Sequence, residues 1–279
     1  GVNRLSIGVQ SFSAASLQAL GRIHGPEQAR EAVLAARQAG FDNLNLDLMF
    51  GLPGQDLAIA RRDLENALVL APEHLSYYQL TLEPNTAFHA RPPVLPDEDR
   101  SSDMLQQGQA LLAAAGFGQY EVSAYARPGR RCRHNLNYWG FGDYLGIGAG
   151  AHGKLTDPAR HRIERRWKRR HPATYLLPPQ RCRLVSGTRL LSDEDLVLEF
   201  AMNALRLQAG VEAHRYTATT GRSSSEANMC AGSGSAAVKG TVSSPPPLTM
   251  VLRGPTISPR TTPSRCVTRV TTPPVSPPY

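Results

Sequence analysis

The sequence predicts an α/β fold in which strands and helices alternate and the strands run parallel. In "NRLSIGVQSF", the apolar Leu5, Ile7 and Val9 alternate with polar residues, as in a strand with one buried face. "PEQAREAVLAARQAG" places proline in the first helical turn, repeats apolar residues at helical spacing and ends on Gly40. This strand–helix unit recurs about every 35–45 residues, which is the pattern of a parallel α/β repeat.

The repeat continues through the first half of the chain. A second strand is predicted in "DNLNLDLMFG", where Leu44, Leu46 and Leu48 alternate with polar residues, and a helix follows in "DLAIARRDLENALVLAP". The next predicted elements are a strand in "HLSYYQLTLE", a helix over residues 104–115 and a fourth strand in "YEVSAYA".

One face of each predicted strand is polar. The residues on these faces are Ser6 and Gln10, Asn45 and Asp47, and Gln79 and Thr81. A strand covered by helices on both sides has two apolar faces, so this pattern favours a partial βα barrel whose interior is lined for a ligand. Polar residues late in each strand then lie at the carboxyl-end mouth, where βα barrels hold their active sites.

Composition divides the chain into three parts. We expect barrel sequence over residues 1–153, where the repeat stops, and a small, mostly helical domain over residues 154–221. This domain is predicted to contain a basic, loop-rich stretch and a capped amphipathic helix in "SDEDLVLEFAMNALRL". Residues 222–279 hold ten of the 22 prolines, and we expect a disordered, aberrant tail there, because such a composition buries too little apolar surface to fold.

Charge and cysteine usage exclude several classes of protein. The formal net charge is +8, but residues 217–279 contribute six basic side chains against one acidic, so the charge does not indicate a nucleic-acid partner. The four cysteines are far apart, without a CxxC pair, which excludes a disulfide framework and a zinc or iron–sulfur site built from local ligands. Without a long apolar run or a leader, the chain is expected to be cytoplasmic.

Several segments together resemble one family. They are "GVNRLSIGVQSF", "LGRIH", "AGFDNLNLDLMFGLPGQ", "LSYYQLTLEPNT", "YEVSAYARPG", "HNLNYW" and "LGIGAGAHG". Their order and spacing resemble the oxygen-independent coproporphyrinogen III oxidase family of radical S-adenosylmethionine (SAM) proteins, and "HNLNYW" resembles its haem-chaperone branch. The resemblance covers roughly residues 1–216. It implies a [4Fe–4S] cluster held by a CxxxCxxC loop, which this sequence lacks and which we expect upstream of Gly1.

The resemblance also implies a SAM site. Its residues are Gln10, the Arg22 that faces the SAM carboxylate, the Asp47 that accepts the ribose hydroxyls, Thr81 through its backbone, and His152 against the adenine. Each has an alternative from the sequence alone. Gln10 would bridge strands, Arg22 would pair with a surface acid, Asp47 would cap the helix after "GLPGQ", and His152 would be a packed loop histidine.

"HNLNYW" carries the prediction for haem. The resemblance implies that His134 is an axial ligand to haem iron, with Asn135 or Asn137 orienting it and with Tyr138 and Trp139 offering flat faces to the porphyrin. The alternative is that the aromatic residues plug the barrel while His134 and the asparagines cap a turn. For the basic run at residues 161–171 we expect a solvated loop, and contact with tetrapyrrole propionates is the alternative.

The resemblance implies a haem chaperone that binds haem and passes it to acceptor haemoproteins, with a [4Fe–4S] cluster and SAM as cofactors. The alternative is an enzyme, a coproporphyrinogen III dehydrogenase of porphyrin biosynthesis. The expected partners are haem and haem-accepting proteins, with transient membrane association only through those acceptors and with no nucleic acid.

Overall fold

The computed structural model describes residues 1–177 and 183–222, so the predicted tail lies outside the described residues, except for Arg222. Packing divides the chain into two units, Gly1–Arg133 and a second unit that begins at His134. Each unit is described by itself. The division falls twenty residues before position 153, where the strand–helix repeat was expected to end, because the segment from His134 onward packs within the second unit.

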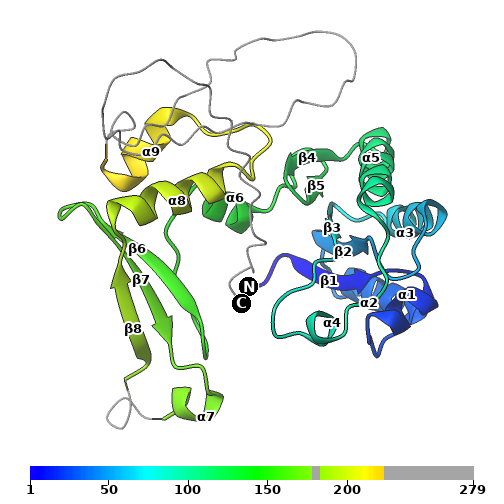
Figure 1. The fold of residues 1–279 in the computed structure, drawn as a ribbon, viewed down its shortest axis with the longest axis horizontal. Helices are drawn as coiled ribbons and strands as arrows, with labels where there is room; N and C mark the ends of the chain where they lie inside the picture. Colours follow the sequence, from blue (N-terminus) through cyan, green and yellow to red (C-terminus); the bar gives the residue numbers. More distant parts are fainter. Residues whose placement is uncertain (178–182, 223–279) are drawn as a thin grey trace, which may run out of the picture. The chain divides into compact units, whose positions relative to one another are not determined.

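The first unit contains a five-stranded mixed sheet with the strand order β1-β2-β3-β5-β4 (Figure 1). Its strands are β1 (Leu5–Gln10), β2 (Leu44–Phe50), β3 (His74–Gln79), β4 (Gly118–Glu121) and β5 (Ala124–Ala126). β1, β2 and β3 run parallel, as the alternating pattern predicts. β5 pairs antiparallel with both β3 and β4, because a turn at Val122–Ser123 breaks "YEVSAYA", predicted as one strand, into a hairpin.

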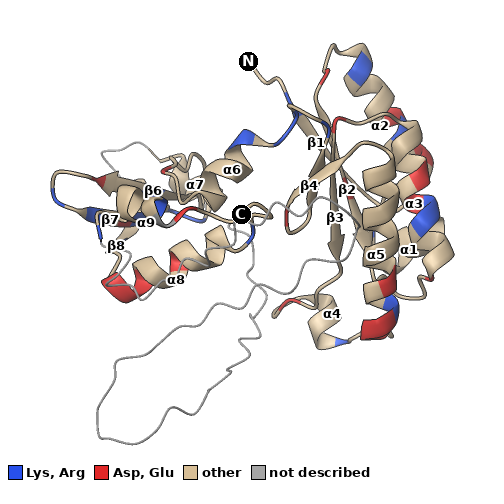
Figure 2. Cartoon of the chain, turned by 90° about the horizontal axis from the view of Figure 1, so that it is seen from above, with Lys and Arg blue, Asp and Glu red and all other residues tan. Residues whose placement is uncertain are grey.

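Helices α2, α3 and α5 cover one face of this sheet. The helices of the unit are α1 (Ala14–Ala19), α2 (Pro26–Gln38), α3 (Leu57–Val69), α4 (Ala87–Ala90) and α5 (Glu98–Ala114). Phe88 of α4 packs instead with Met49 and Tyr78, which lie on the other face. Figure 2 shows α2, α3 and α5 on the same side of β1–β3. The apolar residues of the strands, such as Leu46 and Leu75, pack there against Val33, Leu64 and Met104, all at most 1% exposed. The opposite face of the sheet therefore carries the polar side chains.

The second unit is built on a three-stranded antiparallel sheet, where the sequence predicted mainly loops. Its strands are β6 (His152–Asp157), β7 (Arg162–Lys168) and β8 (Val185–Leu190), and its helices are α6 (Arg133–Trp139), α7 (Pro172–Tyr175), α8 (Asp193–Ala204) and α9 (Ala213–Thr220). The basic run is therefore mostly strand β7. The apolar and polar residues of β7 do not alternate clearly, because charged side chains occupy both faces of the strand. Arg165 pairs with Glu199 of α8, and Arg166 pairs with Glu164 of its own strand.

A small apolar core holds α8 against β7. Ile163 packs with Phe141, Leu196, Phe200 and Tyr216, and α8 is the helix that the sequence predicted, with the Ser192 side chain accepting a hydrogen bond from the Asp195 amide. None of the helices described here is long and apolar enough to cross a membrane.

Candidate functional site

Gln10 ends β1 in an unusual backbone conformation. Its φ is 68°, in the left-handed region, and the register between β1 and β2 shifts between Gly8 and Gln10. A glutamine in this region is strained, and such strain persists only where the surroundings hold it in place. The bulge turns the Gln10 side chain over Gly8, where an added Cβ would lie 2.9 Å from the amide nitrogen Nε2. Glycine at position 8 therefore makes room for this side chain.

The buried Asp63 of α3 holds the backbone that follows Gln10. Its carboxylate accepts hydrogen bonds from Ser11 Oγ at 2.7 Å, from the Phe12 amide at 2.6 Å and from Gln55 Nε2 at 3.3 Å. Burial raises the pKa of Asp63, although these hydrogen bonds act in the opposite direction. One carboxyl group thus fixes the loops that follow β1 and β2.

Tyr78 lies near three of the four residues of the first unit that are predicted to bind SAM. Its hydroxyl donates to Gln10 Oε1 at 2.8 Å, which joins β3 to β1. Burial and the charge of Asp47 raise the pKa of Tyr78 to about 12, while the Gln10 hydrogen bond and the charge of Arg22 lower it. Gln10, Arg22 and Asp47 are therefore all close enough to act on one phenol. Gln10 does bridge two strands, as its alternative interpretation holds.

The Asp47 carboxylate lies half-buried on the face of the sheet opposite α2, α3 and α5. Its Oδ1 accepts from Asn45 Nδ2 at 2.7 Å and its Oδ2 from Ser6 Oγ at 3.0 Å. It does not cap the following helix, because Asp56 is the N-cap of α3 and accepts from the Ile59 amide at 2.7 Å. Each carboxylate oxygen keeps lone pairs for further donors, which suits the paired hydroxyls of a ribose.

Arg22 and Thr81 differ in how much of their side chains is engaged. Arg22 is exposed in the turn after α1, and no carboxylate in the described ranges forms an ion pair with it, so its guanidinium is available to a ligand carboxylate. Thr81 Oγ1 donates to Glu83 Oε1 at 2.9 Å, which leaves the backbone of Thr81 for any ligand contact.

His152, the fifth predicted SAM residue, belongs to the second unit, where it begins β6. Its exposed ring stacks on Trp167 of β7, with 6.4 Å between the ring centroids and 26° between the planes. Trp167 in turn lies against Gly187 of β8, where no Cβ would fit. His152 is thus the outer layer of an aromatic stack rather than a packed loop histidine.

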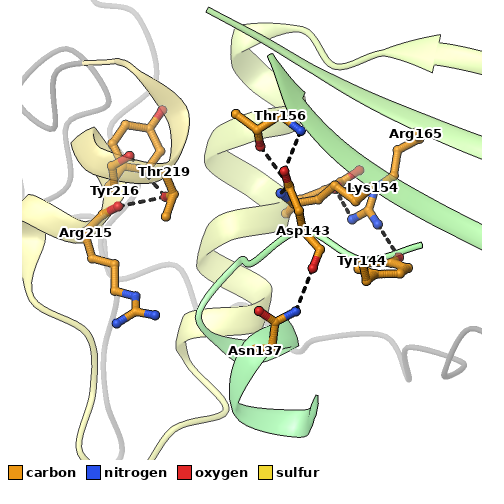
Figure 3. A network of polar contacts seen from close by, with 10 residues as sticks. Asn137, Asp143, Tyr144, Lys154, Thr156, Arg165, Arg215, Tyr216 and Thr219 are labelled. Carbon is orange, nitrogen blue, oxygen red and sulfur yellow. Dashed lines mark hydrogen bonds and ion pairs between the residues drawn. The ribbon is translucent and has the colours of Figure 1, made fainter. Parts of the chain in front are cut away.

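"HNLNYW" forms the short helix α6, with His134 exposed on it. The His134 ring meets the Tyr138 ring edge-on at 6.1 Å between centroids, and Tyr138 meets Tyr144 at 4.6 Å. Asn137 Nδ2 donates to the Asp143 carbonyl at 2.9 Å, so it fixes the loop after the helix (Figure 3). Asn137 is therefore structural and not the group that orients His134.

An ion pair holds the loop after α6 against the sheet (Figure 3). The Lys154 ammonium, 2% exposed, donates to Asp143 Oδ1 at 2.8 Å and lies 4.3 Å from the centre of the Phe141 ring. Thr156 adds hydrogen bonds to the same carboxylate from its amide at 2.7 Å and from its hydroxyl at 2.8 Å. Burial raises the pKa of Asp143, but these donors outweigh burial and the pKa lies below its usual value.

The described residues do not hold a metal cluster. Within residues 1–177 and 183–222, no group of three His, Cys, Asp or Glu side chains is placed to bind a metal ion. Cys132 is buried and is not part of a disulfide. The ligand set of a [4Fe–4S] cluster, three thiolates in a CxxxCxxC loop, therefore has no counterpart in this part of the chain.

Comparison with known proteins identifies the family. Residues 1–65 match the family model of the radical SAM superfamily. The heme chaperone HemW of Escherichia coli is 53% identical over 221 residues, 79% of this chain and 57% of that protein. The chain is a HemW homologue of the radical SAM superfamily. HemW of Bacillus subtilis is 35% identical over 80% of this chain and 59% of that protein.

A solved structure supports the same fold. The coproporphyrinogen III oxidase HemN of E. coli, described as a radical SAM enzyme, superimposes with a TM-score of 0.64 at 21% identity, over 80% of this chain and 54% of that one. The predicted α/β fold of the radical SAM type is thus confirmed. The chain spans a little more than half the length of the HemW proteins that it matches.

Three residues of the site in the first unit escaped the sequence analysis. Tyr78 lies on the polar face of β3, two positions after Ser76, so the alternation of "HLSYYQ" contains the signal for it. Asp63 occupies a position within the apolar stripe of α3, and an acid there is itself a signal. His74 lies on the same face of β3 as Tyr78, two positions before Ser76, but nothing marks its partner Tyr120, which lies 46 residues further along the chain.

Proposed function

We propose that this HemW homologue acts in a haem chaperone that binds haem through His134 and passes it to acceptor haemoproteins. The observation that carries the proposal is the exposed imidazole of His134, in a motif of a chain 53% identical to a protein named heme chaperone. A neutral imidazole is a common haem ligand, and His134 lies on the exposed surface of α6. Identities of 35–53% to heme chaperones, against 21% to the oxidase, favour the chaperone over porphyrinogen decarboxylation.

SAM is the second ligand of the proposal, since radical SAM proteins bind it together with a [4Fe–4S] cluster. On this chain, Asp47 would accept the ribose hydroxyls, Arg22 would pair with the carboxylate, and Gln10 would add a contact from its fixed position beside Tyr78. Thr81 would contribute its backbone, and the role of His152, which belongs to the second unit, stays a prediction. The described residues do not fit the cluster, so no step is assigned to it.

A haem titration of the protein, followed through the Soret band, tests the proposal. We expect His134→Ala to weaken haem binding at least about tenfold and to change the spectrum, since it removes an axial ligand. His171→Ala is the matched control, because His171 is an exposed histidine of the same unit whose side chain caps nothing. Unchanged affinity and spectrum in His134→Ala would show that His134 is not a ligand. The proposed acceptors and cytoplasmic location remain predictions.

A further inference from the structure

A continuous line of hydrogen bonds crosses the face of the first unit's sheet that lies opposite α2, α3 and α5. It starts at the Cys132 amide, which donates to the Tyr120 hydroxyl at 3.3 Å, and this hydroxyl lies 2.8 Å from His74 Nε2. His74 Nδ1 lies 2.6 Å from Asn45 Oδ1, and Asn45 Nδ2 donates to Asp47 Oδ1. The line therefore ends on the carboxylate that is proposed to bind the ribose.

Each donor and acceptor along this line is determined by its neighbours. Asn45 donates through Nδ2 to Asp47 and Ser6, so its Oδ1 is the acceptor and His74 Nδ1 must carry a proton. In a neutral ring Nε2 is then an acceptor, and the Tyr120 hydroxyl donates to it. Burial raises the pKa of Tyr120 to about 12, so this phenol keeps its proton at neutral pH.

The sheet brings Tyr120 and His74 together over small residues. His74 pairs with Ala126 of β5, and β4 shifts register between Gln119 and Glu121, at Tyr120 itself. The alanine offers no obstacle to the phenol that reaches over it. Both rings are buried, His74 at 1% and Tyr120 at 3% exposure, so neither is arranged to bind a ligand directly.

We propose that His74 and Tyr120 are positioning residues that fix the Asn45 amide and, through it, the Asp47 carboxylate for ribose binding. The reason is the near symmetry of an amide. If the Asn45 amide turned over, its oxygen would face the Asp47 carboxylate and its NH2 would face the Nδ1–H of His74, which are two repulsive contacts. The tautomer of His74, held by Tyr120, prevents that turn. This inference rests on the proposed role of Asp47.

The first measurement is the tautomer of His74 in the ligand-free protein, from ring ¹⁵N chemical shifts. We expect the proton on Nδ1 in the wild type and a mixture of tautomers in Tyr120→Phe, which loses the donor to Nε2. A wild-type ring protonated on Nε2 alone would overturn the proposal, whatever the binding data show.

The second measurement is the affinity for S-adenosylhomocysteine, which carries the same ribose as SAM and cannot react. We expect Asp47→Ala and His74→Ala to bind at least about tenfold more weakly and Tyr120→Phe several-fold more weakly. His74→Asn, whose amide takes the place of Nδ1–H, is expected to stay within about threefold of wild type. His89→Asn, at an exposed histidine of α4, is the control.

The two measurements distinguish the positioning role of His74 and Tyr120, here called the relay, from the ribose site at Asp47. If Asp47→Ala loses affinity while His74→Ala and Tyr120→Phe bind like wild type, the relay is wrong and the ribose site stands. If Asp47→Ala also binds like wild type, the proposed ribose site fails, and the positioning role fails with it. Circular dichroism melting identifies any variant that is unfolded, and His74→Asn and Tyr120→Phe are conservative enough to carry the test.

Discussion

Two aspartates anchor loops next to the proposed ligand residues, and they do so in opposite electrostatic settings. Asp63 in the first unit is 2% exposed and is surrounded by neutral donors, and its pKa is raised. Asp143 in the second unit is partly exposed and meets a buried ammonium, and its pKa is lowered. The first anchor therefore depends on hydrogen bonds satisfied away from water, whereas the second depends on a charge pair.

The largest effect is expected from Asp63→Ala. The change leaves the Ser11 hydroxyl, the Phe12 amide and the Gln55 amide group buried without their acceptor, so we expect the free energy of unfolding to fall by about 3 kcal/mol. Urea denaturation followed by circular dichroism measures it. Asp42→Ala is the control, since the Asp42 side chain is 79% exposed and its pairing with Arg130 contributes at most about 0.5 kcal/mol. Equal effects of both changes would contradict the role of Asp63.

Removing either partner of the ion pair between Asp143 and Lys154 should cost a different amount of stability. Asp143→Ala leaves the buried Lys154 ammonium without its carboxylate, and we expect a loss of about 2 kcal/mol. Lys154→Met should cost about half as much, near 1 kcal/mol, because Asp143 is partly exposed and keeps both hydrogen bonds from Thr156. Tryptophan fluorescence isolates this unit, since both tryptophans, Trp139 and Trp167, lie in it. A larger loss of stability in Lys154→Met than in Asp143→Ala would contradict the view that the buried ammonium depends more on its partner than the carboxylate does.

The smallest effect is expected on the pH dependence of stability, which the two aspartates change in opposite directions. The pKa of Asp63 in the folded protein lies above the ordinary 3.8 of an aspartate, so ionisation of this carboxyl lowers the stability as pH rises from 3.8 through the folded pKa. Asp63→Asn should therefore flatten the pH dependence of stability. The pKa of Asp143 lies below 3.8, so its contribution is complete above that pH and is lost as pH falls through the folded pKa. Urea midpoints measured between pH 3 and 7 should show that Asp143→Asn removes the loss of stability at acid pH. If both variants changed the slope of stability against pH in the same direction, this expectation would be contradicted.

The sequence predicted those features that depend on neighbouring residues. Alternation in β1 and β2 placed Asp47 on a polar strand face, and Ser192 marked the start of α8. It offered Asp47 as a cap of the helix after "GLPGQ", whereas in the structure Asp56 accepts from the Ile59 amide at the start of α3. β7 was taken for a loop, because the composition "RIERRWK" carries no apolar alternation beyond Ile163 and Trp167.

Long-range partners were beyond the sequence. The ion pair of Arg165 with Glu199 spans 34 positions and the contact of His74 with Tyr120 spans 46, and nothing in either local pattern names the partner. The strain at Gln10 was equally hidden, because a glutamine at the end of a strand is ordinary in sequence and its left-handed φ arises from the loops that Asp63 holds.

The bulge in β1 also limits which residues can occupy position 10. The register with β2 is regular from Leu5 to Gly8 and shifts before Gln10, where the backbone enters the left-handed region. A β-branched residue is strongly disfavoured in that region, although valine and isoleucine are ordinary residues of a strand. The backbone at the end of β1 therefore restricts position 10 to side chains that tolerate a positive φ, before any contact with a ligand is made.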